Sequence, residues 1–150
     1  MTANAIFRTQ SVATCLAIVL LAAYPANPVH ARSKAANWLV DQQIQEGCDG
    51  AKGRFSGGSV IERDLTGDGK PDLIIDHSGL QCGRSGSRSG FCGIKACSVL
   101  FYERQGDLLQ LRNETLSIGV SVGKGKRPKI GLVGHNGKRG TVRWNGRQFR

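Results

Sequence analysis

The sequence lacks the zinc-protease motif and the phosphate-binding motif of common enzymes. Its 150 residues contain no H-E-x-x-H segment. The glycine-rich stretch 83–90 has no lysine followed by serine or threonine, so it is not a phosphate-binding P-loop. Aromatic residues make up only 6% of the chain, and few of them accompany its basic segments, which argues against specific nucleic-acid recognition. These absences favour a protein that is not an enzyme.

Long apolar runs are also missing. The longest run, 12–23, is too short to cross a bilayer as an ordinary helix, which needs about 20 residues. It follows a short polar stretch with Arg8 and precedes Val29-x-Ala31, which is the order of a secretory signal peptide. Cys15 lies inside the run rather than after it, so we expect it to be lost with the signal and not acylated. We expect residues 1–31 to be cleaved and 32–150 to form one secreted or periplasmic domain.

Acidic residues are few: 11 Asp and Glu stand against 21 Lys and Arg, for a formal net charge of +10. From residue 115 to the end there are nine Lys and Arg and no acid. Such a surface attracts anionic partners, and export favours lipopolysaccharide, anionic lipid or acidic polysaccharide over nucleic acid. The alternative is a solvated basic face without a partner. The candidate anion-binding residues are Lys124, Lys126, Arg127 and Lys129.

Four cysteines remain after the expected cleavage: Cys48, Cys82, Cys92 and Cys97. An even number in a small exported domain indicates two disulfides. The spacing Cys92-x4-Cys97 would also suit zinc, but a second close Cys or His pair is missing. Three pairings exist. If the strands before Cys82 and after Cys97 are antiparallel neighbours, these two cysteines pair, and Cys48 pairs with Cys92.

The hydrophobic pattern predicts one helix followed by short strands. Apolar residues near helical spacing indicate a helix over 33–46, capped by Ser33 and ended by Gly47. Stretches 52–59 and 83–90 are expected to be loops, and Asn136-Gly137 is typical of a type I′ turn. Without helices between strands, we expect a mainly β fold, with a small antiparallel sheet, sandwich or open barrel. The expected strands are 60–63, 73–77, 98–103, 108–112, 116–122, 129–135 and 141–144. Strands 98–103 and 108–112 are expected to form a hairpin about the turn Gln105-Gly106-Asp107.

The strongest chemical signal is the segment D-L-T-G-D-G-K-P-D at 64–72. Oxygen-bearing residues recur at alternate positions, and Gly69 stands sixth, where a loop around a cation needs a residue free to adopt a positive φ. The all-oxygen set suits Ca²⁺. The predicted ligands are Asp64, Thr66 or a water that it holds, Asp68, the carbonyl of Lys70, and Asp72.

Two features limit this hypothesis. Position 12, where an EF-hand has a bidentate glutamate, is Ile75, so the loop is not an EF-hand. Asp and Gly are also favoured in turns, and Arg63 and Lys70 neutralise part of the acidic charge. The alternative is therefore a metal-free turn that leads into the strand 73–77.

The segment D-L-T-G-D-G-K-P-D-L-I-I resembles the loop and strand of FG-GAP and VCBS repeats, which are calcium-loop units of integrin-type propellers and bacterial surface proteins. The resemblance implies that the acidic positions bind calcium. Such repeats occur several to a chain, whereas this chain has one, so neither a propeller nor an adhesive role follows. Segments 91–102 and 142–149 are similar to small secreted bacterial proteins without an established function.

Histidine offers the one enzymatic alternative. Asp76-His77-Ser78 invites a triad hypothesis, but neighbouring side chains on a strand point to opposite faces. The runner-up is a small hydrolase that uses His77 together with the acidic loop. The sequence favours a non-enzymatic binding or structural module with one calcium loop, then a basic surface for anionic envelope components. The aromatic residues expected to serve in core or half-buried packing, rather than as ligand platforms, are Trp38, Phe101, Tyr102 and Trp144.

Overall fold

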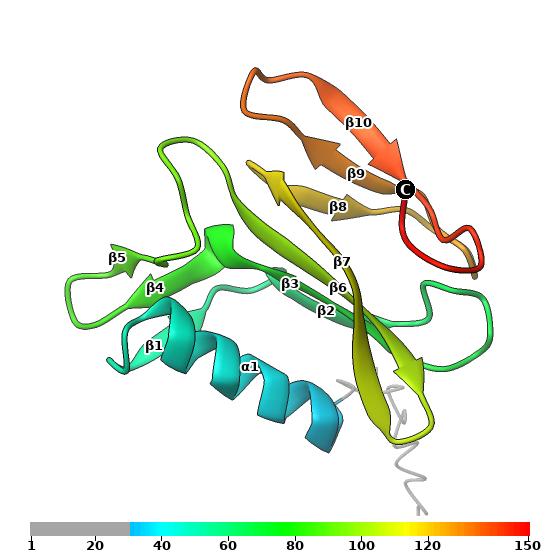
Figure 1. Cartoon of the computed structure of the whole chain (residues 1–150), viewed down its shortest axis with the longest axis horizontal. Coiled ribbons are helices and arrows are strands. Elements are labelled where there is room, and N and C mark those ends of the chain that lie inside the picture. The colour runs from blue at the N-terminus through cyan, green and yellow to red at the C-terminus, as the bar shows by residue number, and fades with distance from the viewer. Residues whose placement is uncertain (1–30) are drawn as a thin grey trace, which may run out of the picture. The chain divides into compact units, whose positions relative to one another are not determined.

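Four antiparallel strands form the central sheet of the computed structural model, which describes residues 31–150 (Figure 1). The predicted signal peptide lies, up to His30, outside the described residues. The strand order is β2-β3-β6-β7. Strands β6 and β7 form the predicted hairpin about Gly106, whose φ is 59°. The strands are β2 (Val60–Arg63), β3 (Asp72–Asp76), β6 (Cys97–Gln105) and β7 (Leu108–Ser117).

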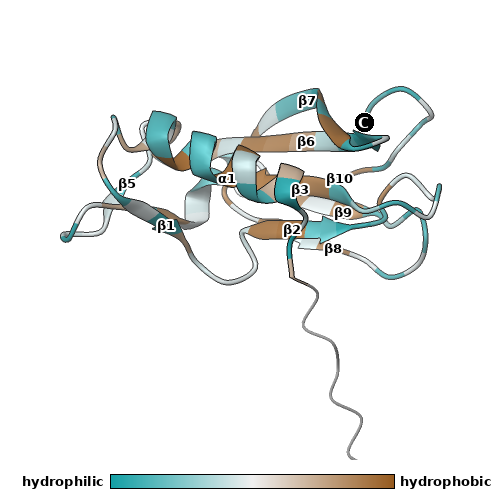
Figure 2. Cartoon of the chain, turned by 90° about the horizontal axis from the view of Figure 1, so that it is seen from below, coloured by the Kyte–Doolittle hydropathy of each residue, from teal (hydrophilic) through white to brown (hydrophobic). Residues whose placement is uncertain are grey.

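Both faces of the two central strands are covered. On β3, Leu73 and Ile75 pack in a cluster with residues of helix α1, whereas Ile74 packs on the opposite side with Phe101. Successive side chains of a strand point to opposite faces, so a strand covered on both sides needs apolar residues at consecutive positions. This explains the unbroken apolar run at the start of β3, and Figure 2 shows much of β6 in the brown of hydrophobic residues.

Helix α1 (Lys34–Gly47) confirms the helix predicted over 33–46, and it covers one face of the sheet. The Ser33 side chain accepts a hydrogen bond from the backbone N–H of Ala36 and caps the helix. Gly47 allows close approach at the other end, since a Cβ there would lie 2.7 Å from Oγ of Ser89. The prediction for Trp38 was wrong: its side chain is 65% exposed because it lies outside the buried stripe of the helix. That stripe comprises Ala36, Leu39, Val40, Gln43 and Gly47.

A second antiparallel sheet, in the order β10-β9-β8, covers the other face. Trp144 and Phe149 follow it and pack against Phe101, with the Phe101 and Phe149 ring centroids 5.2 Å apart. The burial predicted for Phe101, Tyr102 and Trp144 is thus confirmed. The predicted strand 116–122 is divided, since its first residues end β7 and its last form β8. The strands are β8 (Val120–Val122), β9 (Ile130–Val133) and β10 (Arg139–Val142).

The turn between β9 and β10 is not the predicted type I′. That turn needs a positive φ at both central residues. Asp49 is the one non-glycine residue with a positive φ among residues 31–150, so Asn136 has a negative φ, whereas Gly137 has a φ of 78°. The N–H of Gly137 bonds to the carbonyl of Gly134. The loop is therefore one residue longer than a two-residue hairpin, with glycine in the left-handed position.

A third sheet, in the order β1-β4-β5, occupies stretches that were expected to be loops. Strand β1 (Gly53–Phe55) pairs with β4 (Leu80–Cys82), and β4 pairs with β5 (Ser87–Arg88). A short 3-10 turn, η1 (His77–Gly79), joins β3 to β4. These strands have two or three residues each, too few for a periodic hydrophobic pattern to predict them.

The disulfides are Cys48–Cys82 and Cys92–Cys97, so the pairing favoured from the sequence was wrong. The strand predicted before Cys82, now β3, does pair antiparallel with β6, which begins at Cys97. The two cysteines are nevertheless apart because η1 and a further strand, β4, follow β3, and Cys82 ends β4 in the small sheet near the end of α1. All four cysteines are in disulfides, which excludes the zinc alternative.

The predicted fold class, mainly β with one N-terminal helix, is confirmed. In the described chain the strands form three small antiparallel sheets and no closed barrel. Within residues 31–150, no helix is long and apolar enough to cross a membrane.

Candidate metal centre

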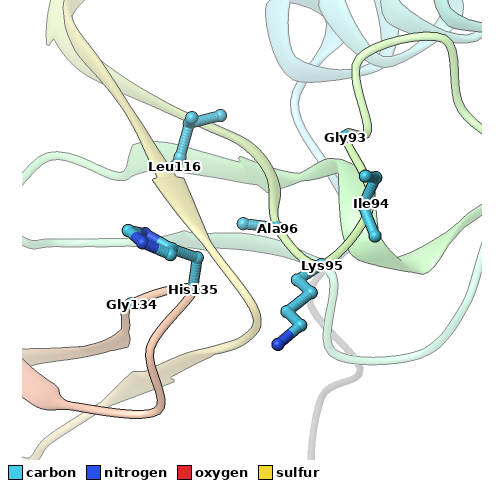
Figure 3. Close-up of a pocket in the computed structure, with 7 residues that line it drawn as sticks. All are labelled: Gly93, Ile94, Lys95, Ala96, Leu116, Gly134 and His135. Atoms are coloured by element: carbon cyan, nitrogen blue, oxygen red, sulfur yellow. The ribbon is translucent and has the colours of Figure 1, made fainter.

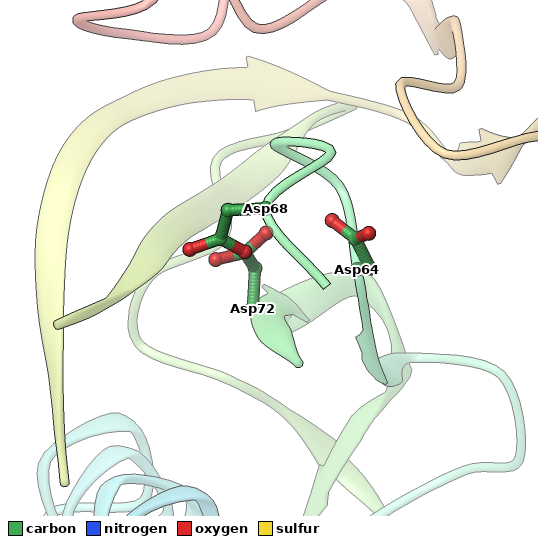
Figure 4. Close-up of side chains that lie close together, drawn as sticks. All are labelled: Asp64, Asp68 and Asp72. Carbon is green, nitrogen blue, oxygen red and sulfur yellow. The ribbon is translucent and has the colours of Figure 1, made fainter. Parts of the chain in front are cut away.

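The acidic loop 64–72 joins β2 to β3 and brings its three aspartates together (Figure 4). One carboxylate oxygen from each of Asp64, Asp68 and Asp72 lies within 4.8 Å of the others. Asp68 is exposed, Asp64 is half-buried and Asp72 is fully buried. Three carboxylates at this separation repel one another by a few kcal/mol per pair in a partly solvated site, which is roughly the Coulomb energy at 4 Å with an effective dielectric constant of 20. The loop therefore has the composition and geometry to hold a divalent cation.

Asp72 holds the loop against the sheet. Its Oδ2 accepts hydrogen bonds from the backbone N–H groups of Leu65 and Thr66, at 2.8 and 2.9 Å. Its Oδ1 accepts one from the N–H of Arg104 on β6, at 2.9 Å. Burial raises the pKa of Asp72 above its ordinary value, and these three N–H groups act in the opposite direction. Asp72 thus fixes the entry of β3, and Oδ1 keeps a lone pair for a cation.

The other two carboxylates are held by the loop itself. Asp64 accepts hydrogen bonds from the N–H groups of Gly67 and Gly69, at 2.6 and 3.0 Å. Asp68 accepts one from the N–H of Lys70, at 2.9 Å. Gly69 has a φ of 85°, as the loop pattern predicted for its sixth position. Because backbone donors satisfy part of each carboxylate, the loop keeps its shape without a cation.

Thr66 carries the one unsatisfied buried side-chain group of the described chain. Its residue is 3% exposed, and Oγ1 is the sole buried side-chain nitrogen or oxygen in residues 31–150 without a hydrogen-bond partner of good geometry. The hydroxyl lies close enough to the Asp72 carboxylate to lower its pKa slightly by a weak hydrogen-bond interaction, the smallest of the effects in that direction, although the two groups do not form a well-aligned hydrogen bond. A buried polar atom without a partner is unfavourable by about 1–3 kcal/mol. This oxygen beside the aspartates fits the predicted third position of a cation site.

Asp76, which the sequence placed just beyond the loop, lies at the other end of β3. Its Oδ1 accepts a hydrogen bond from the N–H of Ser78 and caps η1. It is therefore separate from the cluster.

Arg104 supports the loop from the sheet. Its guanidinium donates to the carbonyl of Pro71 at 3.1 Å and forms a buried ion pair with Glu62 at 2.9 Å. The same group donates to the hydroxyl of Ser33, so it joins the start of α1, β2, β6 and the end of the loop. The sequence offered no signal for this network, because its members lie up to 71 residues apart.

The four candidate anion-binding residues lie in the connection between β8 and β9, and all four are exposed. This connection, the basic loop 123–129, contacts the acidic loop. Nε of Arg127 donates to the carbonyl of Thr66 at 2.7 Å, and a Cβ on Gly67 would lie 2.7 Å from Cγ of Arg127. Arg63, the last residue of β2, donates to two carbonyls of the basic loop, those of Gly123 and Gly125, at 3.2 and 3.0 Å. The acidic and basic segments, which the sequence treated as separate, are neighbours.

His77 is not part of the acidic loop. It follows the far end of β3, about 16 Å from Asp72 at the usual rise of a strand. The ring is fully buried, with Nδ1 3.0 Å from Oγ of Ser89 and Nε2 2.9 Å from Oε1 of Gln43. Because an amide oxygen only accepts, Nε2 carries the proton and Ser89 donates to Nδ1. The hydrolase hypothesis that combined His77 with the acidic loop is therefore wrong in its geometry.

Burial lowers the pKa of His77 below 6.5, although Asp76, Glu114 and Glu46 act in the opposite direction. The unfolded chain therefore binds a proton more readily than the folded chain between the lowered pKa and 6.5. We expect stability to be full above pH 6.5 and to fall as the pH decreases through this interval, by up to about 1.4 kcal/mol per pH unit. Chemical denaturation in EDTA between pH 7 and 5 measures this slope.

The variant His77→Gln should be less stable at pH 7 and should lose that slope, whereas His135→Gln should keep it because His135 is exposed. The raised pKa of Asp72 contributes a slope of the opposite sign to the dependence of stability on pH. Because Asp72 is present in both proteins, the difference between His77→Gln and the unmodified protein isolates the contribution of His77. A slope unchanged in His77→Gln would contradict the prediction.

Two of the depressions outside the loop contain a histidine. One, of about 470 Å³, is mainly apolar and lies between the Cys92–Cys97 loop, β7 and the β9–β10 turn (Figure 3). Ile94 and Leu116 line it, and His135 and Lys95 are its titratable groups. The other, of about 200 Å³, includes His77 and Tyr102, whose pKa burial and two glutamates raise to about 12.

Comparison of the chain with protein-family models, with curated proteins and with solved structures finds no match.

Proposed function

We propose that the protein is a secreted or periplasmic, non-enzymatic binding or structural module whose acidic loop 64–72 binds Ca²⁺. The observation that carries the proposal is the unpartnered Oγ1 of Thr66 beside three converging carboxylates. A metal-free turn explains the backbone hydrogen bonds of the loop equally well, but it leaves this buried hydroxyl without a partner. A cation at the centre of the loop would use it directly or through a bound water.

The donor set suits calcium better than the other common cations. All five predicted donors are oxygens: three carboxylates, one hydroxyl and the carbonyl of Lys70. Thiolates and imidazoles, which zinc and copper prefer, are not among them. Magnesium requires near-ideal octahedral geometry, whereas calcium accepts six to eight ligands in irregular arrangements. The resemblance of the segment to FG-GAP and VCBS units also supports calcium.

The cation would stabilise the loop rather than switch the fold. The loop is already held by backbone hydrogen bonds to Asp64, Asp68 and Asp72, so its shape does not depend on the metal. Asp72 leads directly into β3, the strand with the most completely buried side chains. A bound cation would therefore pin the start of this strand, which is a structural role.

Calcium should raise the melting temperature of the protein. Extracellular calcium modules often bind with a Kd near 10⁻⁴ M, so 1 mM Ca²⁺ would add about 1.4 kcal/mol, or roughly 5 °C for a domain of this size. The measurement is a thermal melt in 1 mM CaCl₂ against EDTA. Mg²⁺ at the same concentration should give a smaller shift.

The variant that tests the site is Asp68→Ala, because Asp68 is a predicted ligand that is exposed and makes one local hydrogen bond. We expect this variant to melt near the unmodified protein in EDTA and to lose the calcium shift. Asp107→Ala removes an exposed aspartate outside the loop and should keep the shift. Identical melting curves of the unmodified protein with calcium and with EDTA would reject the metal in favour of the turn.

A further inference from the structure

The contact between the acidic loop 64–72 and the basic loop 123–129 has a consequence for metal binding. In Figure 1 the two connections, β2 to β3 and β8 to β9, lie at the same end of the molecule. Three hydrogen bonds join them, one from Arg127 to the acidic loop and two from Arg63, at the end of β2, to the basic loop. Arg127 donates to the carbonyl of Thr66, the residue whose buried hydroxyl lies near the Asp72 carboxylate. A guanidinium so close to a divalent cation weakens its binding by repulsion.

An anion between the bound Ca²⁺ and the guanidinium of Arg127 would replace this repulsion with two attractions. Five protein oxygens leave one to three of the six to eight coordination positions of calcium for an external ligand. Nε of Arg127 is used by Thr66, whereas Nη1 and Nη2 have no hydrogen-bond partner in the part of the chain that the structure describes. These two nitrogens form a planar fork that suits the oxygens of an oxyanion.

We infer that the two loops form one composite site, in which Ca²⁺ on the acidic loop and the cations of the basic loop together bind a phosphate monoester. This inference rests on the proposed calcium function. A phosphate monoester carries a charge of about −1.5 to −2 at neutral pH and three acceptor oxygens, so it can contact the metal and Arg127 at once. A carboxylate has a single charge and fewer oxygens, and it matches this density of positive charge less well.

Neighbouring lysines extend the positive charge. Lys124 and Lys126 are exposed on either side of Gly125, whose carbonyl is held by Arg63. Arg63 therefore fixes the basic loop beside Asp64, the next residue along the chain. The arrangement predicts reciprocal coupling: phosphate tightens calcium binding by the same factor as calcium tightens phosphate binding.

Isothermal titration calorimetry of the purified protein tests the coupling. Ca²⁺ is titrated with and without saturating glycerol 3-phosphate, which avoids precipitation of calcium phosphate. We expect glycerol 3-phosphate to tighten calcium binding by about tenfold, within the usual range of coupling between sites. Acetate at the same concentration should have little effect.

Two variants locate the coupling. Arg127→Gln should bind calcium alone at least as tightly as the unmodified protein, because a repelling charge is removed, and should lose the coupling. Lys124→Gln with Lys126→Gln should reduce the coupling without altering the contact of Arg127 with Thr66. Lys138→Gln removes an exposed charge from the β9–β10 turn and should leave the coupling unchanged.

Sedimentation with vesicles distinguishes the source of the phosphate. Binding to phosphatidic acid vesicles, but not phosphatidylcholine vesicles, in Ca²⁺ and its loss in EDTA would assign a lipid headgroup. Coupling to glycerol 3-phosphate without vesicle binding would assign a soluble phosphate ester.

Four results would contradict this proposal. Calcium binding without coupling to glycerol 3-phosphate would reject it and leave the metal proposal intact, whereas absence of calcium binding would reject both. Equal coupling with acetate would reject the phosphate specificity. Coupling that persists in both the Arg127 and the double lysine variants would show that the anion binds elsewhere.

Discussion

Replacing Asp72 with alanine is expected to destabilise the protein by about 4–6 kcal/mol, with or without calcium. The substitution removes three backbone hydrogen bonds to a fully buried carboxylate and leaves the N–H groups of Leu65, Thr66 and Arg104 without partners. Each bond to a charged group contributes roughly 1.5–3 kcal/mol, and the contributions are not fully additive. A domain of this size has a total stability of about 5–15 kcal/mol, so the variant should be largely unfolded or close to it.

Urea denaturation in EDTA measures this loss without interference from a metal. Asp68→Ala is the comparison, since it removes another carboxylate of the same cluster that makes one hydrogen bond in an exposed position; its loss should stay below about 1 kcal/mol. Asp72→Asn should lie between the two, because an amide keeps one acceptor oxygen and turns a donor toward the remaining N–H groups. Equal losses for Asp72→Ala and Asp68→Ala would refute the structural role of Asp72.

Removal of the Cys48–Cys82 disulfide is the second substitution with a large expected effect. The bond links residues 34 apart, and the loop-closure entropy of such a link corresponds to about 4 kcal/mol. It ties the end of α1 to β4, and both sulfurs are buried next to Leu80. The double variant Cys48→Ala and Cys82→Ala should therefore lose much of the stability of the fold in chemical denaturation.

The Cys92–Cys97 disulfide provides the control. It links residues five apart, so the same relation gives about 2 kcal/mol for Cys92→Ala with Cys97→Ala. The pairing itself can be read from a tryptic digest without reduction, because trypsin cleaves at Lys95, between the two cysteines, and leaves their peptides joined. A linked peptide that combines Cys48 with Cys92 would contradict the structure and restore the pairing favoured from the sequence.

Much of the fold could be predicted because its signals are local. The cap at Ser33, the helical spacing of Ala36, Leu39 and Val40, and the hairpin about Gly106 each depend on residues close together in the chain. Elements without a repeating pattern were missed. Strands β1 and β5 have three and two residues, and they form because pairing with β4 supplies their hydrogen bonds.

Some features of the candidate site could likewise be predicted from the sequence, and others could not. The convergence of Asp64, Asp68 and Asp72 was predictable, since all three lie within nine residues and backbone donors of the same loop hold two of them. The contact of Arg127 with Thr66 was not, because 61 residues separate them and either charge pattern alone is typical of a solvated surface. Figure 4 shows the carboxylates that local sequence brought together.

By itself, the sequence determined the mainly β class, the single helix and an acidic loop at the start of a buried strand, since spacing, caps and glycine positions act over a few residues. Tertiary structure decided which cysteines pair, where the basic loop lies and that His77 is enclosed by Gln43 and Ser89. These outcomes depend on which distant segments share a face of the sheet. That choice follows from the packing of both faces of β3 and β6, to which the whole described chain contributes.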